Sequence, residues 1–158
     1  MIVLITGASS GIGCACSERF ASEGYDLIVT GRRLSRLEDL KKKLEDKYNI
    51  KVCILNFDIQ DKVMVHKALE GLNAQWRNID ILINNAGLAL GKGPIHESDI
   101  QDFEVMIDTN VKGLLYVSNW VMNGMKKMKR GHIINLSSTA AKEVYPGGHV
   151  YCASKHAV

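Results

Sequence analysis

Thr6-Gly7-Ala8-Ser9-Ser10-Gly11-Ile12-Gly13 is the stretch that decides the fold, because it lies between an expected strand and an expected helix. Residues 2–5 form an apolar run typical of a buried β-strand, and residues 14–21 have a helical pattern. A glycine-rich turn between them lets a ligand approach the backbone, and the start of the helix suits a pyrophosphate. No Gly-Lys-Ser/Thr closes the loop, so it is not a P-loop for nucleoside triphosphates. We expect nucleotide binding by Gly7, Ser9, Ser10, Gly11, Ile12 and Gly13.

Apolar, β-rich runs alternate with helical patterns along the rest of the chain. We expect strands at 25–30, 52–57, 79–83 and 132–136, and helices at 34–48, 61–75, 98–109, 111–128 and from 151. Continuous apolar strands that alternate with helices are typical of a parallel sheet covered on both faces. Right-handed crossovers then predict a Rossmann-type doubly wound α/β sheet with strand order 3-2-1-4-5.

The end of the sequence bears on domain organisation. The chain stops one turn into its last helical pattern, without a cap or stop signal. We expect residues 1–158 to be a single dinucleotide-binding domain whose C-terminal part is missing.

The composition is that of an ordinary soluble domain, with 46% hydrophobic residues, 23% charged residues and a formal net charge of +3. This mild charge gives no indication of a nucleic acid or membrane partner. No apolar run approaches the length of a transmembrane helix, and no signal peptide is apparent, so we expect a cytoplasmic protein. The four cysteines and five histidines lack the spacing of a metal site, so we expect no metal and predict that the cysteines are buried thiols.

The end of the second strand indicates which dinucleotide would bind. An acidic residue at this point binds the ribose 2′-hydroxyl of NAD, whereas arginine accommodates the 2′-phosphate of NADP. Here Arg32 and Arg33 occupy the position, and a guanidinium offers a planar fork of donors to phosphate oxygens. The sequence therefore favours NADP. The alternative is that the two arginines merely begin a surface helix.

Asp58 and Ile59 follow the third strand, where an adenine ring would lie. The carboxylate of Asp58 is a candidate acceptor for the exocyclic amine, with Ile59 packed on the ring. The alternative is that Asp58 or Asp61 only caps the next helix.

Tyr151 and Lys155 lie four residues apart and would share one face of a helix. A free tyrosine, with a pKa near ~10, is a poor acid–base catalyst at neutral pH, and a nearby ammonium favours its phenolate. Alone, such a pair is more often structural. After the fifth strand of a dinucleotide fold, with Ser138 at the end of that strand, it indicates acid–base catalysis.

Together these motifs resemble the short-chain dehydrogenase/reductase family over the whole chain. The matching residues are Thr6-Gly7-x-x-x-Gly11-x-Gly13, Asn84-Asn85-Ala86-Gly87, Asn110, Ser138 and Tyr151-x-x-x-Lys155. The resemblance implies that Tyr151 exchanges a proton with the substrate oxygen and that Ser138 orients the substrate carbonyl. It implies that Lys155 binds the nicotinamide ribose and that Asn110 holds a water linking Lys155 to solvent. It also implies cofactor contacts from Asn85, Ala86 and Gly87.

A narrower resemblance, over residues 30–33, 79–91 and 106–110, is to the NADP-dependent 3-hydroxy acid dehydrogenases. It implies activity on serine, L-allo-threonine and related 3-hydroxy acids, and reduction of malonic semialdehyde. The family resemblance also implies a homo-oligomer, a tetramer or dimer, paired through the helix at 111–128 and the helix from Tyr151. Tyr145 and His149 are candidates to border the substrate.

Three other functions remain open from the sequence. One is a short-chain reductase of a different carbonyl substrate, and one is an NADP-binding module without catalysis. The third is a sugar-nucleotide epimerase or dehydratase, which shares Tyr-x-x-x-Lys. The spacing of Gly7, Gly11 and Gly13 argues against this third function, because the loop of such epimerases and dehydratases resembles Gly-x-x-Gly-x-x-Gly.

Overall fold

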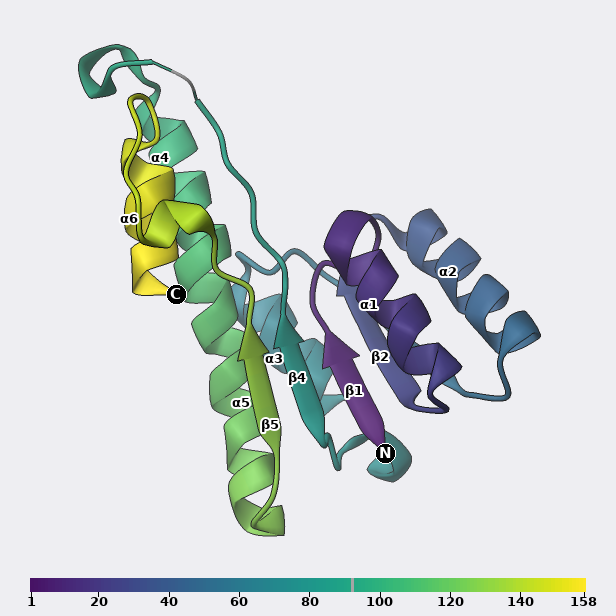
Figure 1. Cartoon of the computed structure of the whole chain (residues 1–158). Helices are drawn as coiled ribbons and strands as arrows, with labels where there is room; N and C mark the ends of the chain where they lie inside the picture. Colours follow the sequence, from purple (N-terminus) through teal and green to yellow (C-terminus); the bar gives the residue numbers. More distant parts are fainter. Residues whose placement is uncertain (92) are drawn as a thin grey trace.

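The computed structural model describes residues 1–91 and 93–158, so Lys92, in the loop expected at 88–94, lies outside the described residues. The described chain forms a sheet of five parallel strands in the order β3-β2-β1-β4-β5 (Figure 1). The strands are β1 (Ile2–Ile5), β2 (Asp26–Gly31), β3 (Val52–Asn56), β4 (Ile81–Asn84) and β5 (His132–Asn135). The doubly wound order predicted from the sequence is confirmed.

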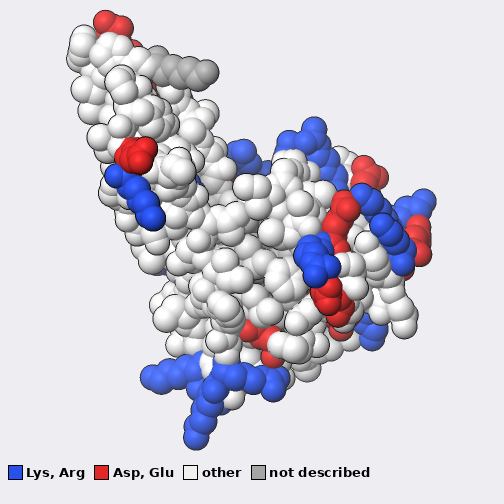
Figure 2. Space-filling model, viewed as in Figure 1, with Lys and Arg blue, Asp and Glu red and all other residues white. Residues whose placement is uncertain are grey.

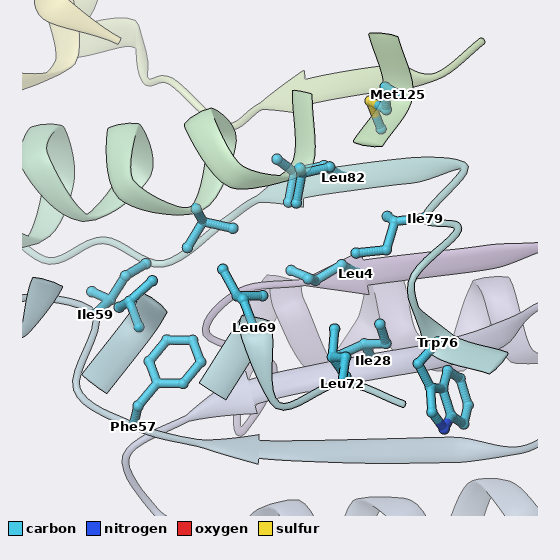
Figure 3. Close-up of a cluster of buried hydrophobic side chains, with 13 residues drawn as sticks. Leu4, Ile28, Phe57, Ile59, Leu69, Leu72, Trp76, Ile79, Leu82 and Met125 are labelled. Carbon is cyan, nitrogen blue, oxygen red and sulfur yellow. The ribbon is translucent and has the colours of Figure 1, made fainter. Parts of the chain in front are cut away.

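Helices cover both faces of the inner strands β2, β1 and β4, which explains why these strands are mostly apolar, whereas three of the four residues of the edge strand β5 are exposed. On one face, α1 (Gly11–Ser22) and α2 (Leu34–Lys47) pack on Val3, Ile5 and Val29. On the other face, α3 (Lys62–Glu70) and α5 (Leu114–Met128) pack on Leu4, Ile28 and Leu82 (Figure 3). Successive strand residues point to opposite faces, so each inner strand contributes to both hydrophobic clusters.

The helix expected at 61–75 is shorter than predicted. It ends at Glu70, and a separate short turn, η1 (Ala74–Trp76), follows Gly71. The indole of Trp76 is buried in the same hydrophobic cluster as α3. Core packing of Trp76 therefore redirects the chain away from the helix axis.

The break expected between helices at 98–109 and 111–128 is absent. α4 (Ile100–Ile107) continues through a wide π-helical turn, η3 (Asp108–Gly113), directly into α5. Gly113 allows close packing there, because a Cβ on it would lie 2.9 Å from Cγ1 of Ile59. Such wide turns occur often at functional sites, and this one contains Asn110.

The prediction of buried cysteines is correct only for Cys152; Cys14, Cys16 and Cys53 are partly exposed. Cys14 and Cys16 lie beside the buried stripe of α1, and Cys53 lies on the edge strand β3. Partial burial raises the pKa of the Cys53 thiol.

A buried carboxylate joins the amino ends of the strands. Asp80 accepts the backbone N–H of Ile2 at 2.9 Å and pairs with Arg130 at 3.0 Å. Arg130 and Lys129 lie in the turn between α5 and β5, next to Lys126 and Lys127 in the last turn of α5, and this basic end of the molecule is at the lower end of Figure 2. The strands point away from this turn in Figure 1. In the described part of the chain, no helix is both long and apolar enough to cross a membrane.

Candidate active site

The glycine loop between β1 and α1 is bound to the end of β4. The hydroxyl oxygen of Thr6 accepts the backbone N–H groups of Asn85 and Ala86, each at 3.0 Å. In return, Nδ2 of Asn85 donates to the carbonyl oxygens of Thr6, at 2.8 Å, and Gly7, at 3.1 Å. The sequence predicted a cofactor contact for Asn85 and no separate role for Thr6. The structure shows that both side chains hold the loop in place.

Gly13 differs from the other predicted loop residues because it is buried beneath the loop. A Cβ on Gly13 would lie 2.5 Å from Nδ2 of Asn85 and 2.5 Å from the carbonyl oxygen of Gly7. Its missing side chain therefore allows α1 to approach β4, and Gly13 does not line the cleft described below.

The substitution Gly13→Ala is expected to lower the free energy of unfolding by about 1–3 kcal/mol, the usual cost of an added methyl group in a packed site. Thermal and denaturant unfolding would measure the change. Gly124→Ala on α5 is the matched control, because its new Cβ would lie 3.8 Å from the nearest atom and alanine favours a helix. Equal stabilities of the two variants would contradict the assigned packing role.

A cleft of about 810 Å³ opens at the carboxyl ends of the strands. Ligands of open α/β sheets bind outside the carboxyl ends of the strands, where this cleft lies. Its lining comes from the glycine loop, the end of β2, the connections after β3 and β4, and α6 (His149–Ala157). The predicted site residues that line it are Gly7, Ser9, Ser10, Gly11, Ile12, Arg32, Arg33, Asp58, Ile59, Asn85, Ala86, Gly87, Tyr151 and Lys155.

Two arginines lie at one end of this cleft. Nη2 of Arg33 donates to the hydroxyl oxygens of Ser9, at 2.9 Å, and Ser10, at 2.8 Å. Arg32 pairs with Asp58 at 3.5 Å. Both arginines are exposed and directly precede α2. Arg32 and Arg33 therefore both precede a surface helix and line the cleft.

Asp58 and Asp61, which the sequence left as alternative caps, have different positions. Asp61 caps α3, since its Oδ1 accepts the N–H of Met64 at 3.0 Å. Asp58 accepts the N–H of Gln60 at 3.1 Å and faces the cleft beside Arg32. Asp58 therefore remains available at the cleft.

Tyr151 and Lys155 lie at the other end, on one face of α6. Nζ of Lys155 is 6.0 Å from the centre of the Tyr151 ring and donates to the carbonyl oxygen of Leu136 at 2.9 Å. Lys155 is only 7% exposed, and this burial lowers its pKa. The ammonium is also close to Gly87, where a Cβ would lie 3.3 Å from Nζ.

Asn110 lies behind the cleft, in the wide turn η3, and is 1% exposed. Its side chain exchanges two hydrogen bonds with the backbone of Leu88, at 2.9 and 2.8 Å. Its Nδ2 also donates to the hydroxyl oxygen of Ser154 at 3.0 Å, and that hydroxyl donates to the carbonyl oxygen of Tyr151. Asn110 thus joins the connection after β4 to α6. Ser154 was missed from the sequence, where its only signal is its position beside Lys155.

Ser138 lies beside the cleft lining rather than in it. Its hydroxyl oxygen accepts the N–H of Ala140 at 3.2 Å and caps the short turn η4 (Thr139–Ala141). The neighbouring Ser137 lines the cleft and donates to the carbonyl oxygen of Lys155 at 2.9 Å. The sequence did not single out Ser137.

Known proteins resemble this chain in sequence and in fold. The family model described as short chain dehydrogenase matches residues 1–158. NADP-dependent 3-hydroxy acid dehydrogenase YdfG of Escherichia coli (strain K12) is 47% identical over 155 residues, covering 98% of this chain and 61% of the relative. The chain therefore spans less than two thirds of that relative's length.

Two solved structures resemble the fold closely. The crystal structure of serine dehydrogenase from Escherichia coli has a TM-score of 0.91 and 47% identity, covering 99% of this chain and 70% of that one. A closed form of serine dehydrogenase complexed with NADP⁺ has the same TM-score and identity, covering 99% of this chain and 61% of that one. With a family match over its full length, this chain belongs to the short-chain dehydrogenase family.

Proposed function

We propose that the protein is an NADP-dependent oxidoreductase that interconverts an alcohol and a carbonyl, and that its substrates are small 3-hydroxy acids. The observation that carries this proposal is one cleft with Arg32 and Arg33 at one end and Tyr151 and Lys155 at the other. The names of the YdfG relative and of the serine dehydrogenase structures support both the cofactor and the substrate class.

The glycine loop is compatible with a bound pyrophosphate. α1 begins at Gly11, and its N-cap residue, Ser10, makes no side-chain capping hydrogen bond. The first N–H groups of the helix are therefore open to an anion. A Cβ on Gly11 would meet no described heavy atom within 4 Å, so the side of Gly11 that a side chain would fill faces open space.

The 2′-phosphate of NADP would be held by Arg32 and Arg33. Ser9 and Ser10 hold the guanidinium of Arg33 over the glycine loop. Asp58 and Ile59 line the same end of the cleft and would contact the adenine. Asn85, Ala86 and Gly87 line the middle of the cleft and would contact the rest of the cofactor.

NADP, when bound, would supply or accept the hydride. The phenol of Tyr151 would give the proton to the substrate oxygen or take it away. The ammonium of Lys155, held by Leu136, would favour the phenolate and contact the nicotinamide ribose. Ser138 would hydrogen-bond the substrate carbonyl, for which its hydroxyl hydrogen is available, because Ala140 is bonded to its oxygen. Asn110 would fix Leu88 and α6 relative to each other and hold the water that links Lys155 to solvent.

Two measurements on the full-length protein test the proposal. Fluorescence titration is expected to show tighter binding of NADPH than of NADH. Turnover is expected with serine, L-allo-threonine or 3-hydroxypropanoate and NADP⁺, and with malonic semialdehyde and NADPH. Binding of NADPH without turnover of any of these would favour a non-catalytic module or a reductase of another carbonyl. Absence of NADPH binding would refute the proposal.

The homo-oligomer is part of the same proposal. Leu115 and Met122 are 56% and 53% exposed and lie seven residues apart, on one face of α5. This apolar face supports pairing of subunits through α5. A tetramer or dimer stays a prediction.

A further inference from the structure

The segment at residues 93–98, which contains the short turn η2 (Ile95–Glu97), contacts the first turn of α6. Residues 85–89, a few positions before this segment, line the cleft, and so does Tyr151 on α6. The backbones meet closely, because a Cβ on Gly147 would lie 3.1 Å from the backbone nitrogen of Gly93. In Figure 1, α4 and α6 lie side by side at the upper left of the view. Residues 93–98 do not line the cleft themselves, but they connect the lining residues 85–89 to α6, which contributes Tyr151 to the end of the cleft where the substrate would bind.

The imidazole of His149 joins them. Its Nδ1 accepts the N–H of Val150 at 3.0 Å, and its Nε2 lies 3.2 Å from the carbonyl oxygen of Gly93 and 3.3 Å from the hydroxyl oxygen of Ser98. The Ser98 hydroxyl donates its hydrogen to the carbonyl oxygen of Pro94 at 3.0 Å, so it accepts from His149. These partners assign the neutral tautomer with hydrogen on Nε2, shared between Gly93 and Ser98.

Packing also fixes the ring. Phe103 of α4 contacts it edge to face, with ring centres 5.1 Å apart and an interplanar angle of 79°. His149 is partly buried and does not line the cleft itself. His149 was expected to border the substrate. It does not line the cleft, so it can affect the substrate only through the segment that it binds.

We propose that His149 is a positioning residue, which holds the segment 93–98 against α6 and thereby keeps Leu88 and Ala89, which line the cleft, in place at the substrate end beside Tyr151. The inference rests on the proposed function, since it assigns a substrate to that end. It predicts that His149 affects the KM for the carbonyl or hydroxy acid substrate and leaves cofactor affinity unchanged, because Arg33 and the glycine loop lie at the opposite end.

Two substitutions separate the contacts of the ring. In His149→Asn, the side-chain oxygen can still accept from Val150, but the shorter side chain cannot reach Gly93 or Ser98. In His149→Gln, the amide nitrogen reaches the position of Nε2 and can donate to both. The matched control is His132→Asn, the same chemical change at an exposed position at the start of β5.

In the full-length protein, His149→Asn is expected to raise the KM for the substrate about tenfold, the size of the loss of one neutral hydrogen bond. We expect kcat and the NADPH dissociation constant to stay near the wild-type values, and His149→Gln and His132→Asn to stay near the wild-type KM. Equal effects of the Asn and Gln variants, or a loss confined to kcat or to NADPH affinity, would overturn the proposal.

Hydrogen exchange of residues 93–98 in the NADPH complex provides a readout that needs no turnover. His149→Asn is expected to speed exchange in this segment, and His149→Gln to leave it as in the wild type. Absence of turnover by the wild-type protein would refute the proposed function but not the role of His149. Unchanged exchange in His149→Asn would overturn the role of His149 whatever the substrate.

Discussion

The substitution Tyr151→Phe is expected to lower kcat by about three orders of magnitude, within the usual range for loss of a general acid–base group. The change removes one phenol oxygen and leaves the ring that lines the cleft. Lys155 would keep its hydrogen bond to Leu136, because that contact does not involve Tyr151. The dissociation constant of NADPH should therefore stay near its wild-type value. Steady-state kinetics and fluorescence titration on the same preparation would measure both quantities.

Tyr145→Phe provides the control for this prediction. Tyr145 is 49% exposed and does not line the cleft, so the same chemical change there should leave kcat unaltered. Wild-type turnover by the Tyr151→Phe variant would eliminate Tyr151 as the acid–base group. Loss of NADPH binding in that variant would instead indicate a structural role for the phenol.

The double substitution of Arg32 and Arg33 by alanine is expected to weaken NADPH binding about a hundredfold, as expected for loss of charge-assisted hydrogen bonds to a phosphate. NADH lacks the 2′-phosphate, so its affinity should change far less. The ratio of the two dissociation constants, from parallel titrations, is the measured quantity. Equal losses for NADPH and NADH would contradict the assignment of the 2′-phosphate to these residues.

The single substitutions should be unequal. Arg33 is already oriented by Ser9 and Ser10, whereas the charge of Arg32 is partly balanced by Asp58. We therefore expect Arg33→Ala to weaken NADPH binding more than Arg32→Ala. Arg36→Ala, at an exposed position further along α2, is the control for a general loss of positive charge and should have little effect.

Much of the fold could be predicted because its signals are local. The pattern that predicts an apolar strand or an amphipathic helix lies within a short run of consecutive residues. The handedness of the crossovers then determines the order of strands in the sheet. Element ends were less predictable. The helix after β3 ends at Glu70 because Trp76 packs in the core, and the expected break near Asn110 is replaced by a wide turn that packs Gly113 on Ile59. Both outcomes depend on neighbours that are distant in the sequence.

The candidate site divides in the same way. The spacing of Tyr151 and Lys155 and the arginine pair after β2 could be recognised, because each motif lies within a few residues. The partners of Asn110 could not, because Leu88 and Ser154 are 22 and 44 residues away from it. The position of Ser138 beside the cleft could not be predicted either, because the turn η4 determines where that side chain points.

The sequence by itself determined the strand–loop–helix unit around Thr6–Gly13, the order of the strands and the identity of the groups that reach their carboxyl ends. Only the tertiary structure decided what these groups touch. Gly13 and Asn85 support the loop, Ser9 and Ser10 orient Arg33, and His149 joins α6 to the segment after β4. The physical reason is that chain periodicity encodes which face a residue occupies, whereas a hydrogen bond requires its partner, here 23 to 79 residues away, to arrive within about 3 Å.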